Sequence, residues 1–345
     1  MIIEQNISLK NLNTFGIGVT ARYFTEANSA EDISEIISDK QFEKIPKLIL
    51  GGGSNMLFTK DYDGLVIKNN LKGIQLLKED NEFFYVKAGA GEVWHELVMH
   101  CVKNNYGGIE NLSLIPGCVG AGPMQNIGAY GVEIKESLQE LEAFNLAEKK
   151  IKTFSNKDCN FGYRESVFKN TEKNKYIITS VTFKLRKKPV YNTTYGAIEK
   201  ELENMGVKEL SIAAISKAVC NIRSSKLPDH AKIGNAGSFF KNPEVSKAKH
   251  EELKNNFPTI VAYPTDHGTS GEHSRTMKLA AGWLIEQCGW KGKRFGDAGV
   301  HVNQALVLVN YGNAIGQEIY DLSGKILESV NAKFGVQLER EVNII

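Results

Sequence analysis

Glycine is concentrated in two short segments of this sequence, where a bound cofactor is most easily placed. The chain has 345 residues, with 32 glycines against 8 prolines. One cluster, Gly51-Gly52-Gly53-Ser54-Asn55, follows a strand predicted at 47–50, and the other covers 116–131. Glycine lets a backbone approach a ligand closely, and successive N–H groups can converge on phosphate oxygens. Two such loops could hold a diphosphate, although tight turns alone also select glycine.

The two common nucleotide-binding signatures are missing. Neither G-x-G-x-x-G after a strand nor G-x-x-x-x-G-K-[ST] occurs in the chain. A Rossmann dinucleotide site and a P-loop are therefore disfavoured. A diphosphate would have to be held in another way.

Composition narrows the class of protein and its partners. Lys and Arg number 42 and Asp and Glu 40, a net charge of +2, which gives no reason to expect nucleic acid or a membrane surface. Five scattered cysteines without a C-x-x-C pair argue against a disulfide framework and a zinc site, and the seven histidines show no metal spacing. No signal peptide or membrane-length apolar run is visible. We expect no metal and a reducing, cytoplasmic setting.

The pattern of apolar residues predicts a mixed α+β protein. Short strands broken by glycine turns fill the first half, with a helix after Gly91 and antiparallel strands at 138–154 and 176–185. The second half is more helical, and it has strand signals at 259–262 and 305–309. Its helices are predicted at 211–222, 275–288 and 316–334. The stretch 187–192 is typical of a junction between two lobes.

Six segments resemble, in the same order, motifs of the UDP-N-acetylenolpyruvoylglucosamine reductase (MurB) family. They cover nearly the whole chain, and they are Asn13–Gly18, Leu50–Asn55, Ile115–Gly131, Phe161–Ser166, Gly234–Pro243 and Leu338–Val342. The segment Tyr191–Gly196 is similar to the tyrosine loop of the longer subtype.

The resemblance implies a fold and an activity. Residues 1–190 would form an FAD-binding lobe of the vanillyl-alcohol oxidase-like (PCMH) type, with two α+β subdomains split near residue 70. Residues 191–345 would form an α/β substrate-binding lobe whose C-terminal tail returns to the active site. The family's reaction converts UDP-N-acetyl-3-O-(1-carboxyvinyl)-glucosamine to UDP-N-acetylmuramate. A hydride passes from NADPH to FAD N5 and then to the enolpyruvyl methylene carbon.

The resemblance assigns catalytic roles to Arg164, Ser238 and Glu341. A guanidinium suits the substrate carboxylate because it can donate two parallel hydrogen bonds. Ser238 would protonate the carbon next to the one that receives the hydride. Glu341 would stabilise the enolic intermediate or the proton network. Spacing alone does not choose between Glu339 and Glu341, because positions i and i+2 of a strand share a face.

The remaining site residues also come from the resemblance. The residues implied for FAD are Gly51, Gly52, Gly53, Ser54, Asn55, Pro116, Gly117, Gly120, Gln125, Asn126, Gly128, Ala129 and Tyr130. Those implied for the UDP-sugar are Tyr163, Tyr195, Lys226, Asn242 and Gln304. No attachment motif for covalent flavin is present, so we expect non-covalent FAD, and we expect a monomer. Two other hypotheses remain: an FAD oxidase that uses oxygen, and a UDP-sugar-binding protein without redox chemistry.

Overall fold

The computed structural model describes residues 2–194, 196–265 and 276–345. Internal contacts divide the chain into two units. Unit 1 comprises residues 1–7, 20–53 and 62–225, and unit 2 comprises residues 8–19, 54–61 and 226–345. The lobe boundary at residue 190 stays a prediction.

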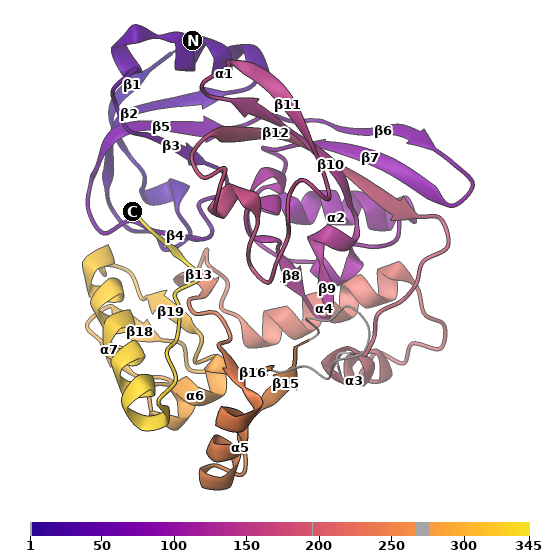
Figure 1. Cartoon of the computed structure of the whole chain (residues 1–345), viewed down its shortest axis with the longest axis vertical. Helices are drawn as coiled ribbons and strands as arrows, with labels where there is room; N and C mark the ends of the chain where they lie inside the picture. The colour runs from indigo at the N-terminus through magenta and orange to yellow at the C-terminus, as the bar shows by residue number, and fades with distance from the viewer. Residues whose placement is uncertain (1, 195, 266–275) are drawn as a thin grey trace. The chain divides into compact units, whose positions relative to one another are not determined.

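Unit 1 contains a small, largely parallel sheet in the order β1-β2-β5-β3 (Figure 1). Its strands are β1 (Glu4–Ser8), β2 (Thr20–Ala27), β5 (Tyr62–Asn69) and β3 (Lys47–Leu50). Helix α1 (Ala30–Ser38) begins with a capping box between Ser29 and Asp32, which satisfies N–H groups at the helix start. Its buried Ile33 and Ile36 join a core with Leu65 and Ile67 of β5. The sheet and its core therefore fix the position of the end of β3, where the first glycine cluster begins.

A second sheet of unit 1 is antiparallel, in the order β11-β10-β12-β7-β6. Its strands are β6 (Ile74–Glu79), β7 (Phe83–Gly89), β10 (Leu138–Asn145), β11 (Lys150–Ser155) and β12 (Tyr176–Arg186). The helix predicted after Gly91 is confirmed as α2 (Trp94–Lys103). Its apolar stripe packs into the core with Val181 and Phe183 of β12. The antiparallel pattern predicted for 138–154 and 176–185 is also confirmed.

Helices α3 (Gly196–Asn204) and α4 (Ile212–Lys226) follow the second sheet. Apart from the last residue of α4, they belong to unit 1. They form a separate core, through Ile198, Ile215 and Val219, against which Tyr130 and Tyr191 pack. Helix α4 is thereby placed beside the second glycine cluster.

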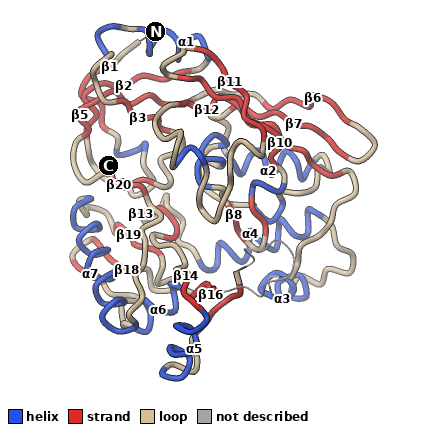
Figure 2. Tube along the Cα trace, viewed as in Figure 1, coloured by secondary structure: helices blue, strands red, loops and turns tan. Residues whose placement is uncertain are grey.

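Unit 2 is built on two small antiparallel sheets, β13-β19-β18-β17 and β14-β16-β15. Their strands are β13 (Gly234–Ser238), β14 (Glu244–Ser246), β15 (Ala262–Pro264), β16 (Thr276–Leu279), β17 (Arg294–Phe295), β18 (Ala298–Val300) and β19 (Val307–Asn310). The helices of this unit are α5 (Lys247–Asn256), α6 (Ala281–Gln287) and α7 (Gly316–Phe334). In the Cα tube of Figure 2, α7 is followed by a tail that ends in β20 (Asn343–Ile344). Strand β20 pairs in parallel with β4 (Met56–Leu57).

The helix predicted at 316–334 is confirmed, whereas that at 275–288 is wrong in its first half. Residues 276–279 form β16, which hydrogen-bonds to β14 on one side and β15 on the other. Pairing on both edges outweighs the helical spacing of the apolar residues, so the helix α6 begins only at Ala281.

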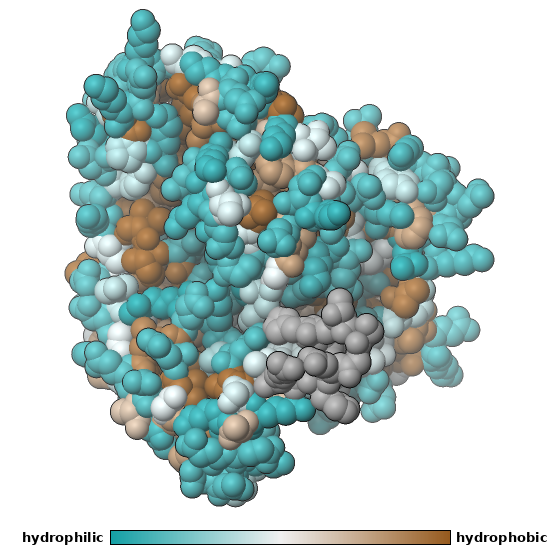
Figure 3. All heavy atoms as spheres, viewed as in Figure 1, coloured by the Kyte–Doolittle hydropathy of each residue, from teal (hydrophilic) through white to brown (hydrophobic). Residues whose placement is uncertain are grey.

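Hydrophilic residues predominate on the face of the molecule in Figure 3, where apolar side chains form scattered groups. None of the helices in the described ranges is both long enough and apolar enough to cross a membrane.

Candidate active site

The two glycine clusters meet within unit 1. A Cβ atom on Gly52 would lie 2.7 Å from the Cα of Gly117, and one on Gly51 would lie 3.6 Å from the Cβ of Cys118. A side chain at position 52 would therefore force the loops apart. Gly117 itself has φ +109°, a conformation that L-residues rarely adopt. The close approach and the positive φ explain why glycine occupies positions 52 and 117.

The meeting point offers unpaired donors and positive charge. Within the described ranges, the backbone N–H groups of Gly51, Gly52 and Gly117 donate no hydrogen bond. The Lys68 ammonium donates to the Gly51 carbonyl. Burial raises the pKa of the Cys118 thiol, and the charges of Lys68 and Lys72 partly oppose that rise. Free N–H groups next to ammonium groups fit the diphosphate of FAD.

Sequence reasoning did not include Lys68 and Lys72 among the candidates. Lys68 lies on β5, opposite Leu50 at the end of β3, and Lys72 donates to the Gly91 carbonyl at 2.7 Å. The one sequence signal for Lys68 is a charged residue that ends the apolar run Leu65-Val66-Ile67. That signal does not indicate which loop lies next to the ammonium group.

The second cluster continues into a short hairpin of β8 (Gly128–Ala129) and β9 (Val132–Glu133). Tyr130 at its tip has φ +51°. The Asn111 amide donates to the carbonyls of Tyr130 at 3.1 Å and Asn192 at 2.8 Å. This amide joins the hairpin to the segment that precedes Tyr195, which itself lies outside the described residues.

Arg164 lies beside the same hairpin. Its guanidinium donates to the Gly128 carbonyl at 2.7 Å and lies 5.3 Å from the centre of the Tyr163 ring. Arg164 occupies a tight turn in which Gly162 and Glu165 exchange backbone hydrogen bonds, and it has φ +57°. Left-handed backbone at a non-glycine residue is uncommon and concentrates at functional sites. The structure thus brings predicted residues Gly128, Tyr163 and Arg164 together.

Asn126 is predicted to contact FAD, but its side chain is fully buried and bonded to protein. The amide donates to Glu133 Oε2 and to the Gly162 carbonyl, both at 2.9 Å, and accepts from the Lys135 N–H at 3.2 Å. These three bonds connect the glycine-rich segment to the Arg164 turn. Its side chain therefore shapes the loop, and a contact with FAD stays a prediction.

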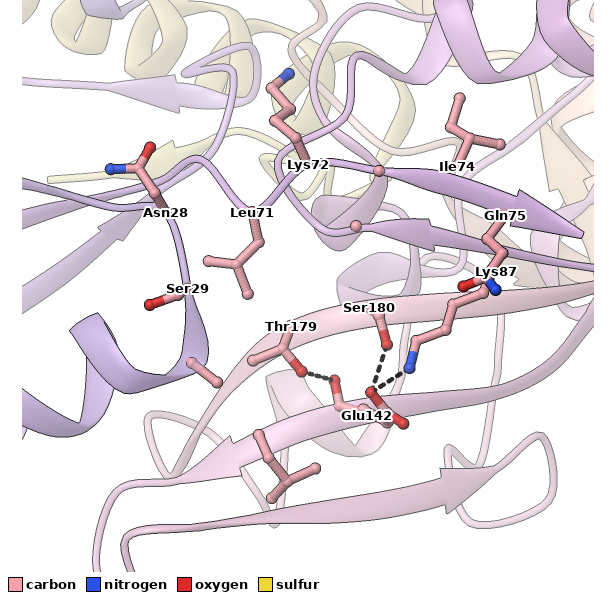
Figure 4. A pocket seen from close by; sticks show the side chains of 14 residues that line it. Asn28, Ser29, Leu71, Lys72, Ile74, Gln75, Lys87, Glu142, Thr179 and Ser180 are labelled. Carbon is pink, nitrogen blue, oxygen red and sulfur yellow. Dashed lines mark hydrogen bonds and ion pairs between the residues drawn. The ribbon is translucent and has the colours of Figure 1, made fainter. Parts of the chain in front are cut away.

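A pocket of about 370 Å³ lies elsewhere in unit 1, on the sheet near the start of α1 (Figure 4). Glu142 accepts from Lys87 at 2.7 Å and from the Ser180 hydroxyl at 2.9 Å. No residue predicted for FAD, substrate or catalysis lines this pocket. Its central polar groups satisfy one another, so we assign it no part in the site.

In unit 2, Ser238 is the last residue of β13 and is partly buried. Ser238 pairs with Val307 of β19, and the pairing is irregular between Asn235 and Ser238. Gly237, within this irregularity, has φ +70°. Its N–H donates to Asn235 Oδ1 at 3.0 Å. The irregular step turns the strand at the residue that presents the hydroxyl.

The C-terminal tail runs antiparallel to the chain that follows Ser238. The Glu341 N–H donates to the Phe239 carbonyl at 2.8 Å, and the Lys241 N–H donates to the Glu339 carbonyl at 2.9 Å. The Asn55 amide donates to the Glu341 carbonyl at 3.3 Å. Glu341 is therefore held by the backbone of Phe239, the residue after Ser238, and by the side-chain amide of Asn55.

The two candidate glutamates of the tail have different surroundings. Glu339 is exposed, and its carboxylate lies 2.7 Å from the Lys241 ammonium. Glu341 is partly buried. The two carboxylates thus differ in exposure, and the catalytic role of Glu341 stays a prediction.

Asn242 and Gln304 both lie at the start of α6. Asn242 Oδ1 accepts from the Ala281 N–H at 3.0 Å, and a Cβ on Gly282 would lie 3.2 Å from Gln304 Oε1. Lys226 is exposed at the end of α4. Within the described ranges there is no group of three or more His, Cys, Asp or Glu residues that could hold a metal ion.

Two sequence models of known protein families match the chain. Residues 21–155 match an FAD-binding domain, and residues 228–345 match the C-terminal domain of UDP-N-acetylenolpyruvoylglucosamine reductase. The first match includes both glycine clusters, and it confirms FAD as the cofactor of this oxidoreductase. The second match includes Ser238 and Glu341.

Relatives match over the whole length. UDP-N-acetylenolpyruvoylglucosamine reductases of Flavobacterium johnsoniae and Amoebophilus asiaticus are 52% and 49% identical, and each comparison covers 100% of both chains. That of Pseudomonas putida is 46% identical over 99% of this chain and 98% of its own.

Among solved structures, the MurB reductase of Thermus caldophilus superposes with a TM-score of 0.69 and 23% identity, covering 100% of this chain and 99% of that one. This likeness confirms the α+β fold class. Identities near one half over the full length decide the family as well. The chain belongs to the UDP-N-acetylenolpyruvoylglucosamine reductase family.

Proposed function

We propose that this chain reduces UDP-N-acetyl-3-O-(1-carboxyvinyl)-glucosamine to UDP-N-acetylmuramate with NADPH, a step of peptidoglycan precursor synthesis. The observation that carries the proposal is the meeting of Gly51–Gly52 with Gly117–Cys118, where N–H groups without partners adjoin Lys68. Such a cradle suits a flavin diphosphate in a chain that lacks the Rossmann and P-loop signatures. The names of the full-length relatives support the substrate.

The predicted FAD residues would hold the cofactor without a covalent bond. Gly51, Gly52, Gly53, Ser54 and Asn55 are proposed to contact FAD from the first glycine cluster. Pro116, Gly117, Gly120, Gln125, Asn126, Gly128, Ala129 and Tyr130 are proposed to contact it from the second. Bound FAD supplies hydride chemistry at N5, towards NADPH and towards the enolpyruvyl carbon.

Three side chains of this chain carry the remaining chemistry in the proposal. Arg164 orients the substrate carboxylate and stabilises the negative charge that develops next to it. Ser238 gives its hydroxyl proton to the carbon beside that carboxylate. Glu341 stabilises the enolic intermediate of the same step or the network of hydrogen bonds that delivers the proton. The half-buried positions of all three support these roles.

The other predicted residues are proposed to bind the uridine diphosphate part of the substrate. These are Tyr163, Tyr195, Lys226, Asn242 and Gln304, with Lys226 neutralising diphosphate charge. We infer a monomer without nucleic-acid or membrane partners. The five cysteines, all free thiols, support a reducing, cytoplasmic location.

An anaerobic titration tests the proposal. Purified protein should be yellow, NADPH should bleach the flavin absorbance, and the enolpyruvyl substrate should then restore it. Colourless protein would leave only a sugar-binding role, and faster reoxidation by oxygen than by substrate would favour an oxidase. Steady-state kinetics should give parallel double-reciprocal lines if NADPH leaves before the substrate enters.

A further inference from the structure

Leu114 has a backbone conformation that leucine rarely adopts. Its φ is +58°, in the left-handed region, and it directly precedes Ile115-Pro116-Gly117 of the second glycine cluster. A branched residue stays in this region only when its surroundings hold it there. The contacts of Leu114 therefore show what fixes the start of the cluster.

Two side chains from different helices hold the backbone of Leu114. His95 of α2 accepts the Leu114 N–H at its Nδ1 atom, 3.0 Å away. Arg223 of α4 donates its Nε–H to the Leu114 carbonyl at 3.2 Å. His95 can accept at Nδ1 only while that nitrogen carries no proton, so the bond requires the neutral ring with hydrogen on Nε2.

Helix α4 also reaches the far end of the cluster. The side chain of Tyr130, a residue with φ +51°, packs against the core that α4 forms with α3. Burial lowers the pKa of the Arg223 guanidinium, and Tyr130 opposes this effect. Helix α4 therefore contacts both left-handed residues between which the segment 115–129 runs, through Arg223 at Leu114 and through its apolar core at Tyr130.

Helix α4 also contacts the turn that precedes Leu114. The hydroxyls of Ser216 in α4 and Ser113 lie 2.8 Å apart, and Ser113 also donates to the Glu110 carbonyl at 2.7 Å. Helix α4 thus contacts the chain at 113, 114 and 130 through side chains. No motif in the sequence connects α4 with the glycine cluster.

We propose that His95 and Arg223 are positioning residues for the flavin, because they clamp Leu114 in the left-handed conformation from which the segment 115–129 starts as a diphosphate cradle. The proposal rests on the proposed function, in which this segment binds FAD. Neither side chain needs to touch the cofactor. Both act by fixing the backbone groups that do.

The test compares FAD dissociation constants of reconstituted apoproteins, measured by quenching of flavin fluorescence. Arg223→Met keeps the volume but removes every donor, and His95→Leu removes the acceptor. We expect each to weaken FAD binding by at least about tenfold, the loss of a hydrogen bond that involves a charge or a strained peptide. His95→Asn, whose side-chain oxygen can replace Nδ1, should stay within about threefold of the parent.

Asn221→Ala is the matched control on the same helix. Asn221 donates to Glu201 Oε1 of α3 at 2.8 Å and makes no hydrogen bond to the glycine cluster. This variant should lose stability without losing FAD affinity. The visible circular dichroism of flavin at saturating FAD should change in Arg223→Met and His95→Leu and remain unchanged in Asn221→Ala.

Unchanged FAD affinity and flavin dichroism in Arg223→Met and His95→Leu would overturn the clamp. Equal losses in Asn221→Ala would also overturn it, since the effect would then be general destabilisation. If Arg223→Met does not fold, Arg223→Lys decides, because lysine keeps the charge but lacks the Nε–H that donates to the Leu114 carbonyl. A parent protein that binds no FAD would instead overturn the proposed function itself.

Discussion

Two regions that carry predicted site residues are held in different ways. The glycine-rich segment of unit 1 (residues 115–131) and its surroundings contain Leu114, Asn126, Tyr130 and Arg164, all with positive φ. The strand–tail pair of unit 2 (residues 238–241 with 339–342) has none, and every non-glycine residue of positive φ in the described ranges lies in unit 1.

The difference lies in what supplies the support. Side chains from α2, α4 and the Arg164 turn stabilise the glycine-rich segment. The strand–tail pair relies on backbone hydrogen bonds, and the left-handed residue just before it is a glycine, Gly237. A loop whose backbone N–H groups converge on a diphosphate needs an irregular conformation. A side chain that donates a proton needs a rigid element, such as a strand end, to hold it in place. Distant side chains should therefore affect cofactor binding, while catalysis should depend on local ones.

The largest expected effect is at the strand end. Ser238→Ala should slow reoxidation of reduced flavin by the enolpyruvyl substrate by about 10²–10⁴-fold, the usual contribution of a positioned general acid. Reduction of the flavin by NADPH should stay near normal, because no proton donor to substrate is needed there. Stopped-flow absorbance measures both half-reactions separately.

Ser246→Ala is the control for this substitution in the same unit. The Ser246 hydroxyl caps α5 by accepting the Lys249 N–H at 3.1 Å, so its loss should reduce stability by about 1 kcal/mol and leave both half-reactions intact. Equal loss of both half-reactions in Ser238→Ala would contradict the assignment of Ser238 as proton donor.

The tail offers the next largest contrast. Glu341→Gln should lower the rate of substrate reduction by about 10–100-fold, because it removes a charged hydrogen-bonding group from the half-buried site. Glu339→Gln should change the rate less than about twofold, since Glu339 is exposed and forms a pair with Lys241. Single-turnover kinetics distinguish the two, and a larger loss in Glu339→Gln would reverse the assignment.

A smaller effect is expected where the glycine clusters meet. Gly52→Ala should weaken FAD binding by roughly tenfold and reduce stability by about 1–3 kcal/mol, because the added methyl would overlap Gly117. Gly18→Ala is the control, since a methyl added there would have open space within 4 Å beyond its chain neighbours. Fluorescence titration and denaturant unfolding measure the two quantities. Equal FAD affinity in both variants would show that the close contact is not needed for the cradle.

The sequence predicted more of the fold than of the side-chain contacts that hold the glycine-rich segment. The helix at 316–334 follows from its apolar spacing, and the six ordered motifs place the glycine clusters, Arg164, Ser238 and Glu341. The helix predicted at 275–288 failed because pairing with two neighbouring strands outweighs local periodicity.

The roles of His95 and Arg223 could not be predicted from the sequence, for a related reason. His95 and Arg223 lie in ordinary amphipathic helices, and each meets Leu114 only through the tertiary fold. Nothing in the sequence around Leu114 indicates a positive φ, since leucine normally avoids it. Contacts between segments far apart in the chain cannot be derived from spacing within one segment.

The smallest expected effect is a pH dependence confined to the glycine-rich region. Burial and the positive charge of Arg223 lower the pKa of His95 from its ordinary value of 6.5, and Glu96 opposes them. The folded protein therefore binds a proton at His95 less readily than the unfolded chain does. The stability that depends on neutral His95 is fully present above pH 6.5 and is lost as the pH falls through the lowered pKa.

Urea unfolding measured at about pH 8 and about pH 5 tests this dependence. The free energy of unfolding should fall less on acidification in His95→Asn than in the parent. His301, whose pKa burial also lowers, is present in both proteins and so cancels from the comparison. An equal loss in the two proteins would mean that protonation of His95 does not disturb the Leu114 backbone, and would contradict the part of the clamp assigned to His95.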